Sequence, residues 1–254
     1  MLFDLRGERE GLLAKLRAAG RPYRGGIQND SYTGSGRPFL NVSAPDLRRL
    51  ARTWLAAHRK DPDAEILAMA ERLLAGEFYE EKILAAVMLG YSARARRLVT
   101  PAMVEAWLGG LNGWAEIDSL CANVFPADEV AADWPAWRAA IGRLSRDANI
   151  NKRRAALVLM TTPTRTSDDA RFRDLAFEVV ERLKGERAIL ITKAVSWLLR
   201  SMAARHGEAV SAYLDAKAGS LPAIAVRETR TKLRTGTKSG RPTAVRQAAR
   251  RGRT

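Results

Sequence analysis

The clearest sign of the fold is the stretch SAPDLRRLARTWLAAHR, residues 43–59. Ser43 is a preferred helix-capping residue, Pro45 suits a first helical turn, and Asp46 places negative charge at the positive end of the helix dipole. Apolar side chains then recur at intervals of three and four residues, which is the period of an amphipathic helix. The stretch therefore predicts a helix over residues 45–59.

The same signals continue along the chain. Runs of alternating polarity rich in β-branched residues, which would predict strands, do not appear. Thr100-Pro101 and Ser167-Asp168-Asp169 repeat the capping pattern. The sequence thus predicts an all-α protein, with helices near residues 2–19, 45–59, 62–75, 77–90, 101–109, 113–124, 133–145, 149–161, 167–184, 187–205, 207–217 and 221–234.

The lengths of these helices and of the turns between them favour antiparallel pairs stacked into an α-solenoid, because antiparallel neighbours need only short connections. No crisp sequence repeat is visible, but helix starts recur every thirty to forty residues or so, the spacing of HEAT-like repeats. We expect one HEAT-like domain over residues 1–234. Its stacked pairs would curve to form a concave, basic groove.

The net charge of +15 and the isoelectric point near 10.7 favour a polyanionic partner, with nucleic acid the leading class. Ribosomal, membrane-surface and simply Arg-rich proteins share such a balance. Six of the fifteen charges lie in residues 235–254, which contain no acidic residue. This composition predicts a disordered basic tail that adds non-specific attraction to DNA.

Cysteine and histidine are scarce, which narrows the possible chemistry. Cys121 is the only cysteine, and His58 and His206 are the only histidines. An internal disulfide, a Cys/His zinc site and a four-cysteine iron–sulfur cluster are therefore excluded. We expect no metal or other cofactor, unless carboxylates bind magnesium. The acidic first residues do not resemble a signal peptide and no apolar run could span a membrane, so we expect a cytoplasmic, nucleoid-associated protein without a membrane partner.

Residues 20–40 predict a long loop rich in glycine. Its aromatic residues alternate with arginines. Two interpretations stay open: a connection packed on the helices by its aromatic rings, or an arm that contacts a nucleic-acid backbone. The residues concerned are Tyr23, Tyr32, Phe39, Arg21, Arg24 and Arg37.

Trp114 and Asp118 are the most informative pair. They lie four residues apart on a predicted helix, so an indole and a carboxylate share one face. Trp114 alone would usually be a core residue. Asp118 could be a surface charge or pair with an arginine; buried beside an indole, it would need a cation, hydrogen-bond donors or a solvated cleft.

Two later helices add cations and a second tryptophan. Arg153 and Arg154 stand at the start of one, where they are either solvated or hold a phosphate with the helix N-terminus. On the other, Lys193 and Trp197 are four residues apart and Arg200 follows three residues later. One face would again place cations beside an aromatic ring.

Four motifs together resemble the AlkD-type DNA alkylation repair glycosylases, in order and in spacing. The resemblance covers roughly residues 20–235 and implies a HEAT-like α-solenoid whose concave face binds duplex DNA. It also implies excision of cationic N3- and N7-alkylated purines without a base-flipping pocket. The motifs are Tyr32…Pro38-Phe39-Leu40, Trp114-x-x-x-Asp118, Asn149-Ile150-x-x-Arg153-Arg154-x-Ala156 and Lys193-Ala194-x-x-Trp197-x-Leu199-Arg200.

The resemblance also implies roles for individual residues. Asp118 would be the catalytic carboxylate, Trp114 and Trp197 the aromatic walls against the deoxyribose, and Arg154 a contact to the DNA backbone. The further DNA-binding candidates are Arg153, Lys193, Arg200 and Tyr32. The expected partner is duplex DNA containing alkylated purines, and the protein is expected to be a monomer.

The chain departs from the family pattern at two places. Asn151 and Ile189-Leu190 stand where family members often have aromatic residues, and we interpret them as packing positions. The competing hypothesis is a HEAT-like protein that binds nucleic acid or serves as a scaffold without catalysis. An acid in a basic groove opposes phosphate binding, so Asp118 favours the enzyme.

Overall fold

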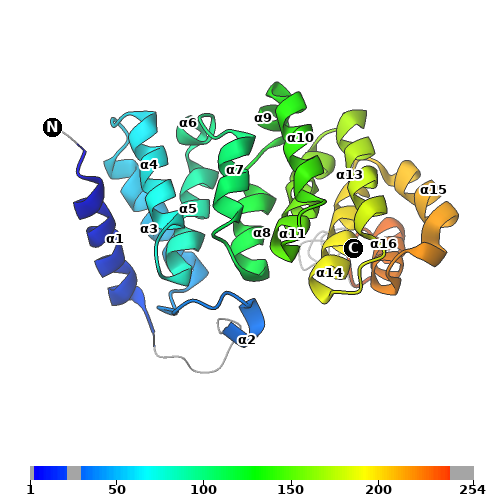
Figure 1. The fold of residues 1–254 in the computed structure, drawn as a ribbon, viewed down its shortest axis with the longest axis horizontal. Helices are drawn as coiled ribbons and strands as arrows, with labels where there is room; N and C mark the ends of the chain where they lie inside the picture. The colour runs from blue at the N-terminus through cyan, green and yellow to red at the C-terminus, as the bar shows by residue number, and fades with distance from the viewer. Residues whose placement is uncertain (1–2, 22–29, 241–254) are drawn as a thin grey trace, which may run out of the picture. The chain divides into compact units, whose positions relative to one another are not determined.

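A computed structural model describes residues 3–21 and 30–240 of the chain (Figure 1). Within these ranges every regular element is a helix, which confirms the all-α prediction. The α-helices are α1 (Leu5–Ala19), α2 (Asp30–Thr33), α3 (Ala44–Ala57), α4 (Asp63–Leu74), α5 (Tyr79–Tyr91), α6 (Ala93–Arg96), α7 (Pro101–Leu108), α8 (Gly113–Asn123), α9 (Ala127–Ala132), α10 (Trp134–Leu144), α11 (Ile150–Leu159), α12 (Thr161–Thr166), α13 (Ala170–Leu183), α14 (Ile189–Met202), α15 (Gly207–Lys217) and α16 (Ala223–Thr235), with a 3-10 helix over Ala218–Ser220.

Each helix that the sequence predicts is present, with its ends moved by a few residues at most. The predicted caps at Ser43 and Thr100 accept hydrogen bonds from the backbone of their first turns. Four additional helices, α2, α6, α9 and α12, have only four to six residues. Such short helices complete too few turns for an apolar period to appear in the sequence.

The chain forms two compact units, Met1–Ala155 and Ala156–Thr254. In the first unit, α5 packs against α3, α4 and α8, while α1 packs against α4 and α7 against α10. In the second unit, α14 packs against α12, α13, α15 and α16. Figure 1 shows the helices of each unit following one another as stacked neighbours. The sequence prediction that residues 1–234 form a single domain with a concave groove stays a prediction.

Helix α14 shows how the pattern of the sequence sets the exposed face. Its fully buried apolar side chains fall at intervals of three and four residues: Ile191, Ala194, Val195, Leu198, Leu199 and Met202. Trp197 and Arg200 lie on the remaining face and are half-buried, whereas Lys193 is exposed. The core of the second unit thus leaves Trp197 and Arg200 accessible from one side.

Two buried glutamates at the start of α5, Glu80 and Glu81, hold neighbouring segments of the chain by hydrogen bonds and an ion pair. Glu80 accepts hydrogen bonds from the backbone N–H groups of Leu40, at 2.9 Å, and Val42, at 3.3 Å. Burial raises the pKa of Glu80, and these backbone hydrogen bonds oppose that rise. Glu81 pairs with Arg9 at 2.8 Å. The loop before α3 and the first helix are thereby held to the core of the first unit.

Lys82 donates hydrogen bonds to backbone carbonyl groups at the end of α4, whereas Glu80 accepts them from backbone N–H groups. The Lys82 ammonium group donates to the carbonyl oxygen of Leu74, at 2.5 Å, and to that of Gly76. Burial lowers the pKa of Lys82 to about 8. The side chain satisfies carbonyl groups that the end of α4 leaves without helical partners.

The described part of the 20–40 segment packs against the helices. Phe39 lies 4.6 Å, between ring centroids, from Tyr79, and the carbonyl of Pro38 accepts a hydrogen bond from the Tyr79 N–H. Arg21 pairs with Asp46 at 3.7 Å. These contacts support the packing interpretation for the residues concerned. Tyr23 and Arg24 lie outside the described residues.

The turn at residues 33–37 is attached to the start of α8 through a buried carboxylate. Glu116 accepts hydrogen bonds from the N–H of Asn112, at 3.0 Å, and from the hydroxyl of Ser35, and it pairs with Arg37 at 3.2 Å. Gly34 and Gly113 both have positive φ, and a Cβ added to Gly34 would lie 3.7 Å from the Gly113 Cα. The two backbones therefore touch without intervening side chains.

The segment from Thr235 begins within the second unit. Helix α16 ends at Thr235, and Lys238 beyond it pairs with Glu228 at 3.2 Å. Residues 235–240 are thus attached to the helices. The sequence predicts disorder for residues 235–254, and of these residues 241–254 lie outside the described ranges. Over the residues described here, no helix has the length and apolar character needed to cross a membrane.

Gly113→Ala should destabilise the protein. At Gly113 φ is +69°, which costs an L-residue about 1–2 kcal/mol, and the new methyl group would clash with the carbonyl oxygen of Thr33. We expect the free energy of unfolding, measured by urea denaturation, to fall by about 1–3 kcal/mol or more.

Gly11→Ala is the matched control. Gly11 lies inside α1, where no atom stands within 4 Å of an added Cβ. An alanine there should stabilise the protein by about 0.5–1 kcal/mol. Equal effects of the two substitutions would contradict the close approach of the turn to α8.

Candidate functional site

Helix α8 carries Trp114 and Asp118 on one face. The residues between and after them, including Ala115, Ile117 and Leu120, are buried in the first unit. Trp114 and Asp118 are themselves half-buried. The predicted helix therefore places the indole and the carboxylate one turn apart at the boundary between core and solvent.

Trp114 is held by Tyr32 of the short helix α2. Its indole N–H donates a 2.7 Å hydrogen bond to the carbonyl oxygen of Tyr32. The rings of Tyr32 and Trp114 are perpendicular, with centroids 5.1 Å apart, and Tyr32 is 51% exposed. Because the polar edge of the indole is satisfied within the protein, Trp114 has apolar surface and π electrons to offer a ligand.

Asp118 is held by a guanidinium fork. Arg154, near the start of α11, donates from Nε to Oδ1 at 2.9 Å and from Nη2 to Oδ2 at 2.7 Å. The exposed fractions of the two side chains are 14% for Asp118 and 6% for Arg154. Such a bidentate pair fixes both the position and the plane of the carboxylate.

Burial and the ion pair act on Asp118 in opposite directions. Burial raises the pKa of Asp118, and the hydrogen bonds and charge of Arg154 reduce that rise. Cys121 lies on the next turn of α8 and is fully buried. Burial, together with the negative charge of Asp118, raises the pKa of the Cys121 thiol well above its usual range. A buried thiol with a raised pKa is a poor nucleophile.

The ion pair leaves part of the Asp118 carboxylate available for chemistry. A carboxylate has about four acceptor sites on its two oxygens. The two hydrogen bonds from Arg154 use one site on each oxygen. The outer sites can accept a hydrogen bond from water or face a developing positive charge.

The structure places the predicted cations Arg153 and Arg154 differently from the sequence interpretation. Arg154 is buried against Asp118, which is the arginine pairing left open as an alternative for this carboxylate. Arg153 donates to the carbonyl oxygens of Asp147, at 2.8 Å, and Ala148, at 2.7 Å. Arg153 thus holds the segment before α11, whereas Arg154 joins α11 to α8. Contact of either arginine with DNA stays a prediction.

Asn151 and Ile189, which depart from the family pattern, differ in how far they are buried. Asn151 is half-buried in the first turn of α11, and its N–H donates to the side-chain oxygen of Asn149 at 2.8 Å. Ile189 is 59% exposed. The packing interpretation is wrong for Ile189, because the first residue of α14 points away from the core of its unit.

In the second unit, Trp197 and Arg200 line a pocket of about 180 Å³. Arg200 donates from Nε to the hydroxyl of Ser196, and the same nitrogen pairs with Glu228, both at 3.3 Å. Burial lowers the pKa of Arg200, and Glu228 opposes this. Lys193 is exposed on the same helix but does not line this pocket.

The sequence did not indicate three further cations in this pocket, one of which, Lys238, is assigned by the sequence to the basic tail. Arg165, Lys232 and Lys238 line the pocket together with Trp197 and Arg200. They come from separate segments, and nothing in their spacing indicates that they meet. Among the described residues, no group of three or more His, Cys, Asp or Glu side chains is arranged to hold a metal ion.

The sequence profile of a family described as DNA alkylation repair enzyme matches residues 12–233. The chain belongs to this family. The match confirms the resemblance drawn from the motifs around Asp118 and Trp197. A search of curated proteins finds no significant match.

A solved structure supports the fold of this family member. It is described as a predicted DNA alkylation repair enzyme from Enterococcus faecalis, with 16% sequence identity and a TM-score of 0.62. The alignment covers 80% of this chain and 92% of that one. At this identity the likeness shows a shared helical-repeat fold.

Arg154→Met should cost about 3–5 kcal/mol of folding free energy, because it leaves the half-buried Asp118 carboxylate without its cation. The double variant Arg154→Met, Asp118→Asn should recover much of this loss, since the unpaired charge is then gone. Urea denaturation of the wild type, both single variants and the double variant gives the coupling energy.

Arg143→Met is the control for the loss of a cation at an exposed pair. Arg143 pairs with Glu105 at 2.5 Å, but its side chain is 61% exposed. Exposed pairs contribute about 0–1 kcal/mol, so this change should be nearly neutral. A loss at Arg154 no larger than that at Arg143 would contradict a desolvated ion pair.

Proposed function

We propose that this chain is a monofunctional DNA glycosylase that removes cationic N3- and N7-alkylated purines from duplex DNA. Membership in the DNA alkylation repair enzyme family supports a role in repair of alkylated DNA. One observation carries the finer proposal: the Asp118 carboxylate, oriented by Arg154, lies one helical turn from the half-buried Trp114.

The alkylated base is a good leaving group. Alkylation at N3 or N7 makes the purine cationic, so the base can leave with the pair of electrons of the N-glycosidic bond and become neutral. No general acid is required. This suits a site whose residues include a carboxylate and aromatic rings but whose nearby thiol, Cys121, is buried.

In this proposal Asp118 acts on the sugar. As the glycosidic bond lengthens, positive charge develops on the deoxyribose, and a fixed carboxylate stabilises that charge without reorganising. An outer acceptor site of Asp118 can also orient the water whose oxygen bonds to the anomeric carbon, and this water releases one of its protons to solvent. The products are a free purine and an abasic site. Arg154 keeps the carboxylate plane fixed throughout.

The aromatic residues would assist through their π faces. Trp114, whose N–H is already bonded to Tyr32, would contact the deoxyribose and stabilise its charge by about 0.5–2 kcal/mol. Trp197 of the second unit is assigned the second aromatic contact by the family resemblance. Tyr32, Lys193 and Arg200 stay proposed DNA contacts.

A DNA-binding protein without catalysis is the second candidate, and one observation favours it. The fork from Arg154 satisfies Asp118 within the fold. The carboxylate therefore needs no catalytic task to explain its partial burial. The two candidates differ in what happens when the charge of Asp118 is removed.

Asp118→Asn should reduce base release from duplex DNA containing one N7-methylguanine by a hundredfold or more, the loss expected when about 3 kcal/mol of transition-state electrostatics disappears. Binding of undamaged duplex should change little. Abasic sites can be counted by alkaline cleavage, and binding by fluorescence anisotropy.

Glu129→Gln is the matched control, because Glu129 also accepts two hydrogen bonds from one arginine, Arg96, in the first unit. Its effect on base release should be small once unfolding curves show that both variants fold. Wild-type base release by Asp118→Asn would exclude the catalytic assignment and favour the binding protein.

Excision should follow the charge of the lesion more than its size. The candidate groups suit the sugar and backbone and do not resemble a closed pocket for a flipped base. N3-methyladenine, N7-methylguanine and bulkier cationic adducts should be released, whereas uracil and 1,N6-ethenoadenine should stay in place. Single-turnover rates on matched duplexes test this.

Either of two results would contradict the charge argument. Efficient removal of uracil would show that the site activates neutral bases. A sharp loss of activity on enlarging a cationic adduct would show that the base enters a confined pocket.

A further inference from the structure

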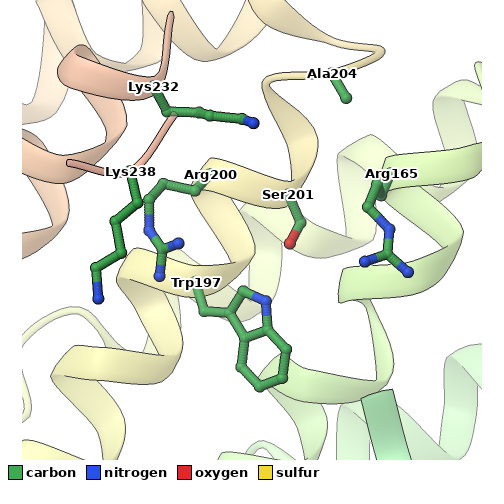
Figure 2. A pocket seen from close by; sticks show the side chains of 7 residues that line it. All are labelled: Arg165, Trp197, Arg200, Ser201, Ala204, Lys232 and Lys238. Atoms are coloured by element: carbon green, nitrogen blue, oxygen red, sulfur yellow. The ribbon is translucent and has the colours of Figure 1, made fainter. Parts of the chain in front are cut away.

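The pocket of the second unit gathers four cations around one indole. Figure 2 shows Trp197 between Arg165 on one side and Arg200 and Lys238 on the other, with Lys232 nearby. No carboxylate is among the described residues that line it. Its volume of about 180 Å³ exceeds by more than tenfold the roughly 10–15 Å³ needed for one water molecule.

These cations come from three separate parts of the unit. Arg165 lies on α12, Arg200 on α14, and Lys232 and Lys238 on and just after α16. Bringing like charges together costs free energy unless an anion is present. Four cations that line one pocket therefore suit a ligand that carries negative charge.

A single carboxylate behind the pocket compensates part of this charge. Glu228 accepts a 2.7 Å hydrogen bond from Ser196 and pairs with Arg200, at 3.3 Å, and with Lys238, at 3.2 Å. Burial alone would raise the pKa of Glu228, but these hydrogen bonds lower it, so the group stays ionised. Four cations and one carboxylate leave a charge of about +3 at the pocket.

Lys232 and Arg165 each have N–H groups left to donate hydrogen bonds to a ligand. Lys232 donates one of its three hydrogens to the carbonyl of Gly236 at 2.7 Å, and Arg165 donates from Nη2 to Thr162 at 3.1 Å. Arg165 and Lys238 are exposed, so the pocket opens to the surface. A polymer can therefore place one group in the pocket while its chain continues on both sides.

We propose that this pocket binds a phosphodiester of the DNA backbone, with the indole of Trp197 as its apolar wall. Arg165, Lys232 and Lys238 would donate to the phosphate oxygens. Arg200, paired with Glu228, would add charge and fix the wall beside the indole. This inference rests on the proposed function for its choice of DNA as the polyanion, but its test does not depend on base release.

The test measures binding of a short undamaged duplex by fluorescence anisotropy over a range of salt concentrations. The double variant Lys232→Gln, Lys238→Gln should bind at least tenfold more weakly at low salt. The slope of log affinity against log salt should become shallower by about 0.9 for each phosphate that the variant no longer neutralises. Arg165→Gln should act in the same direction with a smaller effect.

Lys217→Gln is the matched control, since Lys217 is an exposed lysine of the second unit that does not line the pocket. It should leave affinity and slope nearly unchanged. The double variant Lys232→Arg, Lys238→Arg should restore most of the binding, because charge is kept. Unchanged thermal unfolding of the glutamine variants would show that their weaker binding is not caused by unfolding.

A free phosphate ion is the other source of the same chemistry, and calorimetry with inorganic phosphate tests it. We expect no measurable heat at millimolar phosphate, because a single ion lacks the flanking contacts of a DNA strand. Tight phosphate binding that the double glutamine variant loses, with duplex binding unchanged, would overturn the proposal in favour of a small-anion site.

Failure of this inference can be told apart from failure of the proposed function. If the wild type releases no base but the double glutamine variant loses duplex binding and salt dependence, the pocket assignment stands and the glycosylase does not. If the wild type releases base and the double variant binds like Lys217→Gln, the pocket assignment is wrong.

Discussion

The bidentate ion pair between Asp118 and Arg154 ties α8 to α11 and sets the chemistry of the candidate site. A buried pair adds little stability over well-packed apolar side chains, because desolvation offsets most of the attraction. Removing one partner is costly, however, since the other charge is then left unpaired. The pair therefore acts as a positioning device. It fixes the plane of a carboxylate at the edge of the core while leaving outer acceptor sites on its oxygens.

Other buried carboxylates organise the chain around this pair. Glu80 and Glu116 accept hydrogen bonds from segments that lack regular structure of their own, and each lies near the start of a helix. Through Glu116 the turn at residues 33–37 reaches α8, and Tyr32 then meets the indole of Trp114. The aromatic part of the site thus depends on a carboxylate that does not itself face the proposed substrate. Loss of Glu116 would disturb Trp114 indirectly.

The distribution of charge differs from what the net charge suggests. Several arginines that look available for DNA are engaged within the protein: Arg154 with Asp118, Arg153 with backbone carbonyls and Arg200 with Glu228. The second unit gathers Lys232, Lys238 and Arg165 around Trp197, and of these Lys238 also pairs with Glu228. A count of basic residues therefore favours a class of partner, but it does not show which cations the fold already holds in ion pairs.

The sequence by itself determined the helices and the shared face of Trp114 and Asp118, because helical period and capping depend on residues three or four positions apart. Only the tertiary structure decided that Arg154 pairs with Asp118, 36 positions away, and that Lys238 reaches Glu228 instead of belonging to a free tail. It also decided that Ile189 is exposed and that α2, α6, α9 and α12 form. Pairing and burial across such separations depend on how helices pack, and a local pattern carries no record of that packing.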